Sequence, residues 1–139
     1  MKIHFKKHMN FHTLFSHKQE SHDVPPDTSL WRELTQPSHL DEITKLSFQQ
    51  TVVVYKHSSL CRISRSVLSR LESKIIEQSI DFPLYFLDLI KYRDLSDVIS
   101  YKFRVTHQSP QLLMISNGKS IMNSSHYNIL DNDLEDFLK

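Results

Sequence analysis

The sequence predicts an α/β fold in which a central mixed sheet of about four or five strands is flanked by helices. Apolar runs that are typical of buried strands alternate with segments of helical periodicity. Asn117-Gly118 lies between two strand-like runs and predicts a tight hairpin. The chain has 139 residues, of which 39% are hydrophobic and 24% charged. These values are typical of one globular domain, with room for a short appendage.

The first half of the regular region predicts strand, helix, strand and helix in that order. Residues 30–34 predict a short strand or turn, and Ser38 predicts the N-cap of a short helix that ends near Phe48. The β-branched run 51–55 predicts a buried strand. A longer helix follows, because apolar residues recur there at steps of four. These are Ile63, Val67, Leu71 and Ile75.

The second half predicts a strand, a helix, a hairpin and a closing helix. Residues 82–89 predict a second buried strand, and Ser96 predicts the N-cap of a third helix. The hairpin strands are expected at 111–115 and 119–124, with the only glycine of the chain in the turn between them. Residues 131–138 predict the closing helix.

Residues 1–28 differ in composition from the rest and predict a flexible His-rich N-terminal extension ahead of a domain at 29–139. Five of the nine histidines lie there, and Pro25-Pro26 indicates a boundary. On a helix, His4, His8 and His12 would share one face, a spacing that could bind a transition metal. The alternative is a plain polar tail. No carboxylate or thiolate completes a ligand set, so no metal site is predicted.

Composition also excludes several classes of function. A formal net charge of +1 gives no electrostatic case for binding nucleic acid. A single glycine excludes Walker and G-x-G-x-x-G phosphate loops. A single cysteine excludes an internal disulfide and fits a reducing cytoplasm. No span approaches the ~18 apolar residues of a membrane helix. We therefore expect a cytoplasmic, monomeric protein that binds neither nucleic acid nor membrane.

Cys61 is the candidate nucleophile. It follows a predicted strand and precedes a long predicted helix, and both the helix dipole and the free N–H groups of a helix N-terminus favour a thiolate. Lys56, His57, Arg62 and Arg65 are close in sequence and add positive charge. The alternative is a buried, inert thiol, but the polar residues just before Cys61 argue against it.

The segment Cys61-Arg62-Ile63-Ser64 is a C-x-x-S motif. A dithiol oxidoreductase has a second cysteine at the last position, and a serine there cannot resolve a mixed disulfide. The thiol that completes the reaction must therefore come from outside the chain.

The predicted order of elements resembles the thioredoxin layout, which places a cis-proline opposite the nucleophile. Ser109-Pro110, just before the first hairpin strand, holds the corresponding place. We therefore expect a cis bond there, facing Cys61. An ordinary trans proline is the alternative.

Five separated segments together resemble the YtxJ family of thioredoxin-like, monothiol bacilliredoxin-like proteins of the bacillithiol redox system. They are Tyr55–Ser64, Arg93–Asp97, Val105–Gln111, Asn117–Lys119 and Ser125–Ile129. The similarity covers residues 29–139. It implies that Cys61 is the nucleophile and Pro110 the cis-proline, and it marks His57 and His126 as positions of the family pattern. Family members usually carry proline directly after the cysteine, where this chain has Arg62.

The resemblance implies a monothiol thiol-disulfide oxidoreductase that removes a low-molecular-weight thiol, bacillithiol, from mixed disulfides of client proteins. Cys61 is the expected catalytic residue, and the small thiol is a co-substrate with no other cofactor required. Supporting and substrate-binding residues are expected at His57, Arg62, Ser64 and Arg65, and at Ser109, Pro110 and His126. The alternative is a non-catalytic binding protein, either a scaffold or a glutaredoxin-like [2Fe–2S] carrier. The carrier class usually has Gly-Phe where this chain has Arg62-Ile63.

Overall fold

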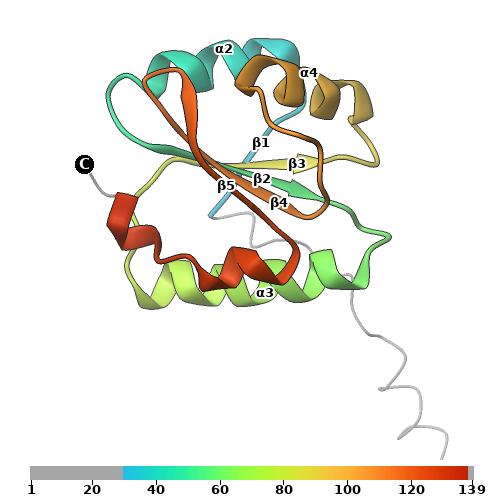
Figure 1. The fold of residues 1–139 in the computed structure, drawn as a ribbon, viewed down its shortest axis with the longest axis vertical. Coiled ribbons are helices and arrows are strands. Elements are labelled where there is room, and N and C mark those ends of the chain that lie inside the picture. The colour runs from blue at the N-terminus through green and yellow to red at the C-terminus, as the bar shows by residue number, and fades with distance from the viewer. Residues whose placement is uncertain (1–29, 138–139) are drawn as a thin grey trace, which may run out of the picture.

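A five-stranded mixed sheet forms the middle layer of the structure, a computed structural model that describes residues 30–137 (Figure 1). The strand order across the sheet is β1-β3-β2-β4-β5. The strands are β1 (Arg32–Glu33), β2 (Val52–His57), β3 (Leu84–Asp88), β4 (Gln111–Ser116) and β5 (Lys119–Ser125). The predicted α/β class, the mixed sheet and the run 51–55 as a buried strand are confirmed.

Strand β2 lies at the centre of the sheet and sets the position of its neighbours. It pairs in parallel with β3 and antiparallel with β4. The register places Lys56 of β2 opposite Leu87 of β3 and Gln111 of β4. The carboxyl ends of β2 and β3 therefore meet the amino end of β4 at one edge of the sheet, and the turns that leave and enter there are neighbours.

Helices cover both faces of the sheet. Helices α2 (Pro37–Leu46) and α4 (Arg93–Phe103) lie on one face. Helix α3 (Arg62–Glu77) lies on the other, together with two short 3₁₀ helices, η1 (His126–Asp131) and η2 (Leu134–Phe137) (Figure 1). This is the arrangement that parallel strands require, because each crossover connection carries a helix over the sheet.

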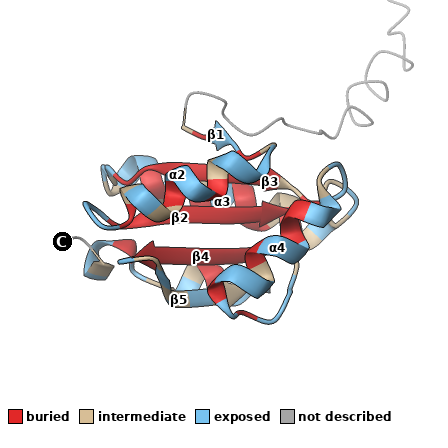
Figure 2. Ribbon diagram, turned by 90° about the horizontal axis from the view of Figure 1, so that it is seen from above, coloured by how far each residue is buried: buried red, intermediate tan, exposed pale blue. Residues whose placement is uncertain are grey.

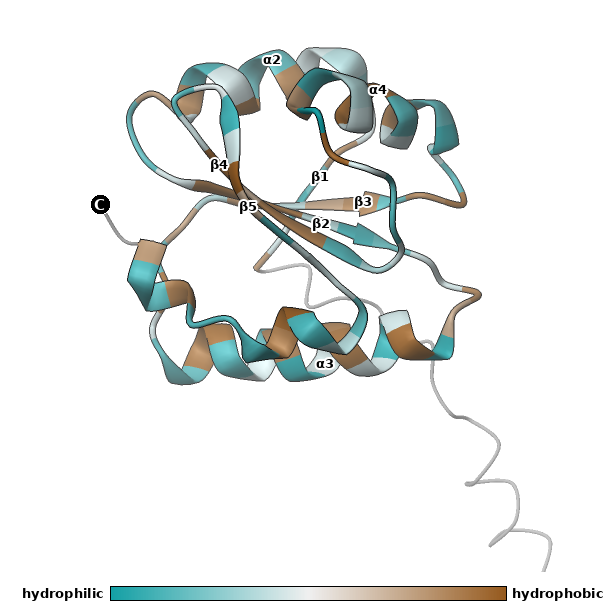
Figure 3. Cartoon of the chain, viewed as in Figure 1, coloured by the Kyte–Doolittle hydropathy of each residue, from teal (hydrophilic) through white to brown (hydrophobic). Residues whose placement is uncertain are grey.

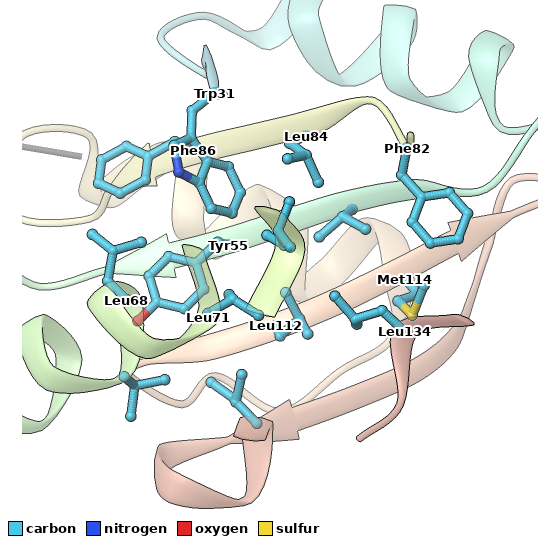
Figure 4. Packing of buried hydrophobic residues seen from close by; sticks show 14 residues of the cluster. Trp31, Tyr55, Leu68, Leu71, Phe82, Leu84, Phe86, Leu112, Met114 and Leu134 are labelled. Atoms are coloured by element: carbon cyan, nitrogen blue, oxygen red, sulfur yellow. The ribbon is translucent and has the colours of Figure 1, made fainter. Parts of the chain in front are cut away.

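Each face of the sheet has its own apolar core, because successive side chains of a strand point to opposite faces. Val53 and Tyr55 of β2 pack in the cluster under α3, whereas Val52 and Val54 pack under α2 and α4. Figure 4 shows the first cluster, with the Tyr55 ring directed toward α3. All six residues of β2 are buried, and Figure 2 shows β2 and β4 buried along their length.

The predicted start of the first helix is wrong. Helix α2 begins at Pro37 with Gln36 as its N-cap, and Ser38 lies inside its first turn. Proline favours the first helical position, because its φ is already helical and its missing N–H has no partner there in any case. That preference outweighs the capping tendency of the serine one residue later.

The predicted start of the third helix is also wrong. Helix α4 begins at Arg93 with Tyr92 as its N-cap, and Ser96 lies buried within the helix. The Asp88 carboxylate accepts the backbone N–H groups of Ile90 and Lys91 at 3.0 and 3.2 Å. The chain therefore turns immediately after β3, and the helix starts a turn early.

The predicted closing helix at 131–138 is replaced by the two short helices η1 and η2, and Leu138 lies outside the described residues. The chain is extended at Asn132 (φ −82°, ψ 136°). The Asn132 side chain donates to the carbonyl of Asn128, and the Asp133 carboxylate accepts from the N–H of Glu135. Such local bonds compete with helix hydrogen bonds and explain the interruption.

The predicted N-terminal extension, with His4, His8 and His12, also lies outside the described residues. None of the helices within residues 30–137 combines the length and the apolar character that crossing a membrane requires.

The predicted Asn117-Gly118 hairpin is confirmed. Both residues have positive φ, 51° and 74°, as a type I′ turn requires. Ser47, just after α2, accepts the N–H of Asn117 at its carbonyl and that of Gly118 at its hydroxyl, at 2.8 and 2.9 Å. The turn is thus attached to the helix layer.

We expect Gly118→Ala to destabilise the protein by about 1 kcal/mol, because an L-residue resists positive φ. A Cβ there would also meet the Phe48 ring at 3.3 Å. Asn117→Gly is the matched control, and it should change the free energy of unfolding by less than about 0.5 kcal/mol. Urea denaturation followed by circular dichroism measures both. Equal stability of the two variants would contradict the assigned turn.

Candidate active site

Cys61 is the N-cap residue of α3, at the edge of the sheet where β2 ends. Its backbone is extended, with φ −104° and ψ 119°, and the residue is half-buried. Its N–H donates to the carbonyl of Ser58 at 3.1 Å, and its carbonyl accepts the N–H of Arg65 at 3.2 Å. These bonds fix the turn that places the thiol at the positive end of a 16-residue helix.

Ser64, the last residue of the C-x-x-S motif, is not at the surface. It is 0% exposed on the inward side of α3. Its hydroxyl accepts the backbone N–H of Ser58 at 3.0 Å and lies 2.9 Å from Nδ1 of His57. Ser64 therefore connects the first turn of α3 to both the end of β2 and the loop that leads to Cys61.

His57 is the final residue of β2 and is 7% exposed. Its ring packs on Phe86 with centroids 5.2 Å apart and is tilted against Tyr55 at 6.1 Å. With Nδ1 directed at Ser64, His57 belongs to the network that holds the Cys61 turn.

Tyr55 completes this network from the apolar core under α3. The sequence alone does not indicate this role. Its hydroxyl donates to the carbonyl of Ser64 at 3.0 Å. Burial raises the pKa of Tyr55 well above its ordinary value, and the nearby Cys61 and Glu72 raise it further. The phenol therefore stays a hydrogen-bond donor at physiological pH. A tyrosine six residues before the cysteine is the only sequence signal that could have indicated it.

The four basic residues around Cys61 in sequence separate in space. Arg62 is exposed and Arg65 half-buried, both in the first turn of α3. Lys56, in contrast, points to the face of the sheet that α2 and α4 cover, since it alternates with Tyr55 and His57 along β2. Its partners are His107 and Gln111. The expectation that Lys56 adds positive charge beside the thiol is therefore wrong.

The Ser109–Pro110 peptide bond is cis, as expected. Pro110 is buried and directly precedes β4, whose first residue pairs with Lys56 near the end of β2. The hydroxyl of Ser109 is buried and has no hydrogen-bond partner among the described residues. The register thus places the cis-proline and the Cys61 turn at the same edge of the sheet.

His126 lies beside the Ser109–Pro110 bond. Its N–H donates to the carbonyl of Pro110 at 3.1 Å, and its φ of 54° turns the chain from β5 into η1. The His126 side chain is exposed, as is that of Tyr127. The structure therefore brings Ser109, Pro110 and His126 together at one end of the sheet, although they are up to 17 residues apart in the chain.

The described residues contain no group of three or more His, Cys, Asp or Glu side chains arranged to hold a metal ion. Cys61 is the only cysteine of the chain, so a cluster bound here would need thiolates from elsewhere. The chemistry that the described groups offer is that of one thiol at a helix N-terminus.

Solved structures similar to this chain share the thioredoxin fold. One, described as a candidate oxidoreductase with a thioredoxin fold, is 29% identical, with a TM-score of 0.64 over 73% of this chain and 87% of the other. Thioredoxin NaTrxh from Nicotiana alata is 13% identical, with a TM-score of 0.62 over 79% and 94%. A mutant thioredoxin from Halobacterium salinarum is 13% identical, with a TM-score of 0.58 over 77% and 89%.

The family comparison is more specific than the fold. A family model described as monothiol bacilliredoxin BrxC matches residues 32–134. The matched span contains all the strands, the Cys61 turn, the cis-proline and His126. The five-stranded sheet, the single thiol at the start of α3 and this match lead to one conclusion: the chain is a thioredoxin-fold member of the monothiol bacilliredoxin BrxC family.

Proposed function

We propose that this protein is a monothiol oxidoreductase that removes bacillithiol from client proteins, with Cys61 as its nucleophile. One observation carries the proposal: Cys61 is accessible at the N-terminus of α3, and the position one turn further holds a buried serine instead of a thiol. A protein with a lone thiol cannot release a bound partner by an intramolecular reaction, because it has no second thiol to attack the mixed disulfide. It can, however, accept a small thiol from a client and pass it on.

The reaction has two exchange steps. The Cys61 thiolate attacks the bacillithiol sulfur of a client mixed disulfide, an S–S bond forms between Cys61 and bacillithiol, and the client leaves as a thiolate. A second small-thiol molecule then attacks the bacillithiol sulfur on Cys61. It releases the Cys61 thiolate and a symmetrical small-thiol disulfide, so that electrons balance without another oxidant or reductant.

The surface around Cys61 suits an anionic carrier. Arg62 is exposed in the first turn of α3, next to Cys61 in the chain. The first N–H groups of a helix have no partner within it and bind anions. The malate carboxylates of bacillithiol need such partners. Glutathione is anionic as well, so the preference for bacillithiol rests on the family, whose name refers to this thiol.

The client is proposed to bind along the cis-proline segment. The backbone of Ser109 would pair with an extended segment of the client, as a strand adds to the edge of a sheet. The exposed side chains of His126 and Tyr127 border the same site. A reducing cytoplasm, where Cys61 stays free, is the proposed compartment.

We expect the protein to take bacillithiol from a bacillithiolated client, and Cys61→Ser to lower this transfer to background. Intact-mass spectrometry follows the adduct leaving the client and arriving on Cys61, with a glutathionylated client in parallel. Transfer of bacillithiol from its client should be faster than transfer of glutathione. If neither adduct moves from its client to fully reduced wild-type protein, the enzymatic proposal is wrong. Visible absorbance after anaerobic purification would then favour a [2Fe–2S] carrier.

We expect the wild-type protein not to reduce insulin, and Ser64→Cys to gain measurable insulin reduction. The substitution would place a second thiol in the first turn of α3, where it can resolve the mixed disulfide on Cys61. Ser64→Ala is the matched control, because it also loses the hydroxyl that the N–H of Ser58 binds. Turbidity of precipitating insulin chains measures the activity. Insulin reduction by the wild type would contradict a monothiol mechanism.

We expect Arg62→Gln to raise KM for the bacillithiolated client by about threefold at low ionic strength, since one exposed charge contributes modestly. Salt screens such a contact, so the difference should shrink at about 0.5 M salt. Arg70→Gln, on the exposed side of the same helix, is the matched control and should have no effect. An equal change in both variants would show that Arg62 makes no specific contact.

A further inference from the structure

A polar cluster, buried except for His107, lies on the face of the sheet opposite α3, and the proposed chemistry does not use it. At its centre is Lys56, which is 0% exposed although it carries an amine. Its Nζ lies 2.6 Å from Nδ1 of His107 and donates to Oε1 of Gln111 at 3.2 Å. Ser96 of α4 adds its hydroxyl 3.3 Å from the same His107 nitrogen. Figure 3 shows that the carboxyl end of β2, the strand that contains Lys56, is hydrophilic.

This cluster is a poor source of stability. Burial lowers the pKa of Lys56 to about 8, against the opposing attraction of Asp97, so the charged amine is disfavoured in its site. Apolar residues of similar volume often serve stability as well as buried charges or better. What distinguishes the amine from an apolar side chain here is its pair of contacts, to His107 and to Gln111.

The geometry concerns one segment, residues 106–110, which leads to β4. His107 lies within the segment and Gln111 directly after it. The ammonium group of Lys56 therefore binds the segment near its start and at its end. The side-chain amide of Gln111 also donates to the carbonyl of Thr106 at 3.0 Å, which closes the segment on itself. Ser109 and Pro110 lie between the bound points. The cluster thus connects the central strand to the segment that is proposed to bind the client.

We propose that Lys56 is a positioning residue: by binding His107 and Gln111 it holds residues 106–110 in the conformation that accepts the client beside Cys61. The inference rests on the proposed function for the identity of the client. The hold itself depends only on the contacts of residues 56, 107 and 111. These residues lie in the segments Tyr55–Ser64 and Val105–Gln111. The proposal thus assigns a function in these segments to residues other than Cys61 and Pro110.

The hold depends on the protonation of His107. To accept from the Lys56 ammonium, Nδ1 of His107 must carry no proton. The pKa of His107 is lowered by partial burial, by Lys56 and by Arg93 of α4, while Asp97 of the same helix raises it; Gln111 of β4 is uncharged. Because the folded pKa of His107 lies below its ordinary value, the contact is present at neutral pH and is lost only as the pH falls through that folded pKa. Above about pH 8 the neutral amine still has N–H groups to donate.

The test compares Lys56→Met and His107→Leu with His107→Asn in the full chain. Leucine removes the acceptor, whereas the Oδ1 of asparagine can accept without titrating. His107 is exposed, so its variants should fold even if Lys56→Met does not. Lys119→Met, at the far end of β4–β5, is the matched control.

NMR order parameters of the backbone amides in residues 106–109 are the first readout. At pH 7.5 we expect values of about 0.85 in the wild type, the control and His107→Asn, and below about 0.6 in Lys56→Met and His107→Leu. Lowering the pH through the titration of His107, followed by its imidazole NMR shifts, should reduce the wild-type values and leave His107→Asn unchanged. Unchanged order parameters in both Lys56→Met and His107→Leu would overturn the inference.

Transfer kinetics are the second readout. Lys56→Met and His107→Leu should raise KM for the client about tenfold with kcat little changed, because they disturb binding and not the thiol. The rate at which iodoacetamide alkylates Cys61 should be the same in these two variants as in the wild type. If wild-type transfer fails while the order parameters change as expected, the proposed function is wrong and the hold stands. If the wild type transfers normally and KM is unchanged in both variants, the role in client binding is wrong.

Discussion

The structure depends on a single constraint: strand β2 is buried on both faces and hydrogen-bonded along both edges. A strand in this position allows no shift of register, because a slip of one residue would exchange its two faces. The alternation of its side chains therefore assigns Tyr55 and His57 to the α3 face and Lys56 to the opposite face. The turns that carry Cys61 and Pro110 are placed by the end of β2 and by the start of its partner β4.

The polar residues at the end of β2 organise the candidate site because buried polar groups need partners. On one face, His57 and Tyr55 bind Ser64, which in turn binds the N–H of Ser58, and this network fixes the turn before Cys61. On the other face, Lys56 binds the segment that contains the cis-proline. Two networks, separated by the sheet, thus support the two surface elements on which the proposed chemistry depends.

Patterns that depend on local physics were predicted well. The buried strand at 51–55 and the Asn117-Gly118 turn follow from β-branched residues and from the need for positive φ. Helix starts are predicted less well, because Ser38 and Ser96 resemble N-cap residues but lie inside their helices. At the first of these, Pro37 competes locally. At the second, the Asp88 turn starts the helix early and packing buries Ser96. The prediction of a closing helix was wrong because the side chains of Asn132 and Asp133 form local hydrogen bonds with the backbone.

The sequence by itself determined the α/β class, the single thiol at the start of a helix and the absence of a resolving cysteine, since these follow from periodicity and residue type. The tertiary structure decided which distant residues the side chains near Cys61 meet. Lys56 and His57 are adjacent in the chain, yet the pleat places one against His107, 51 residues away, and the other against Ser64. Such contacts depend on strand register and helix packing, which bring distant segments together and are not encoded in any local pattern.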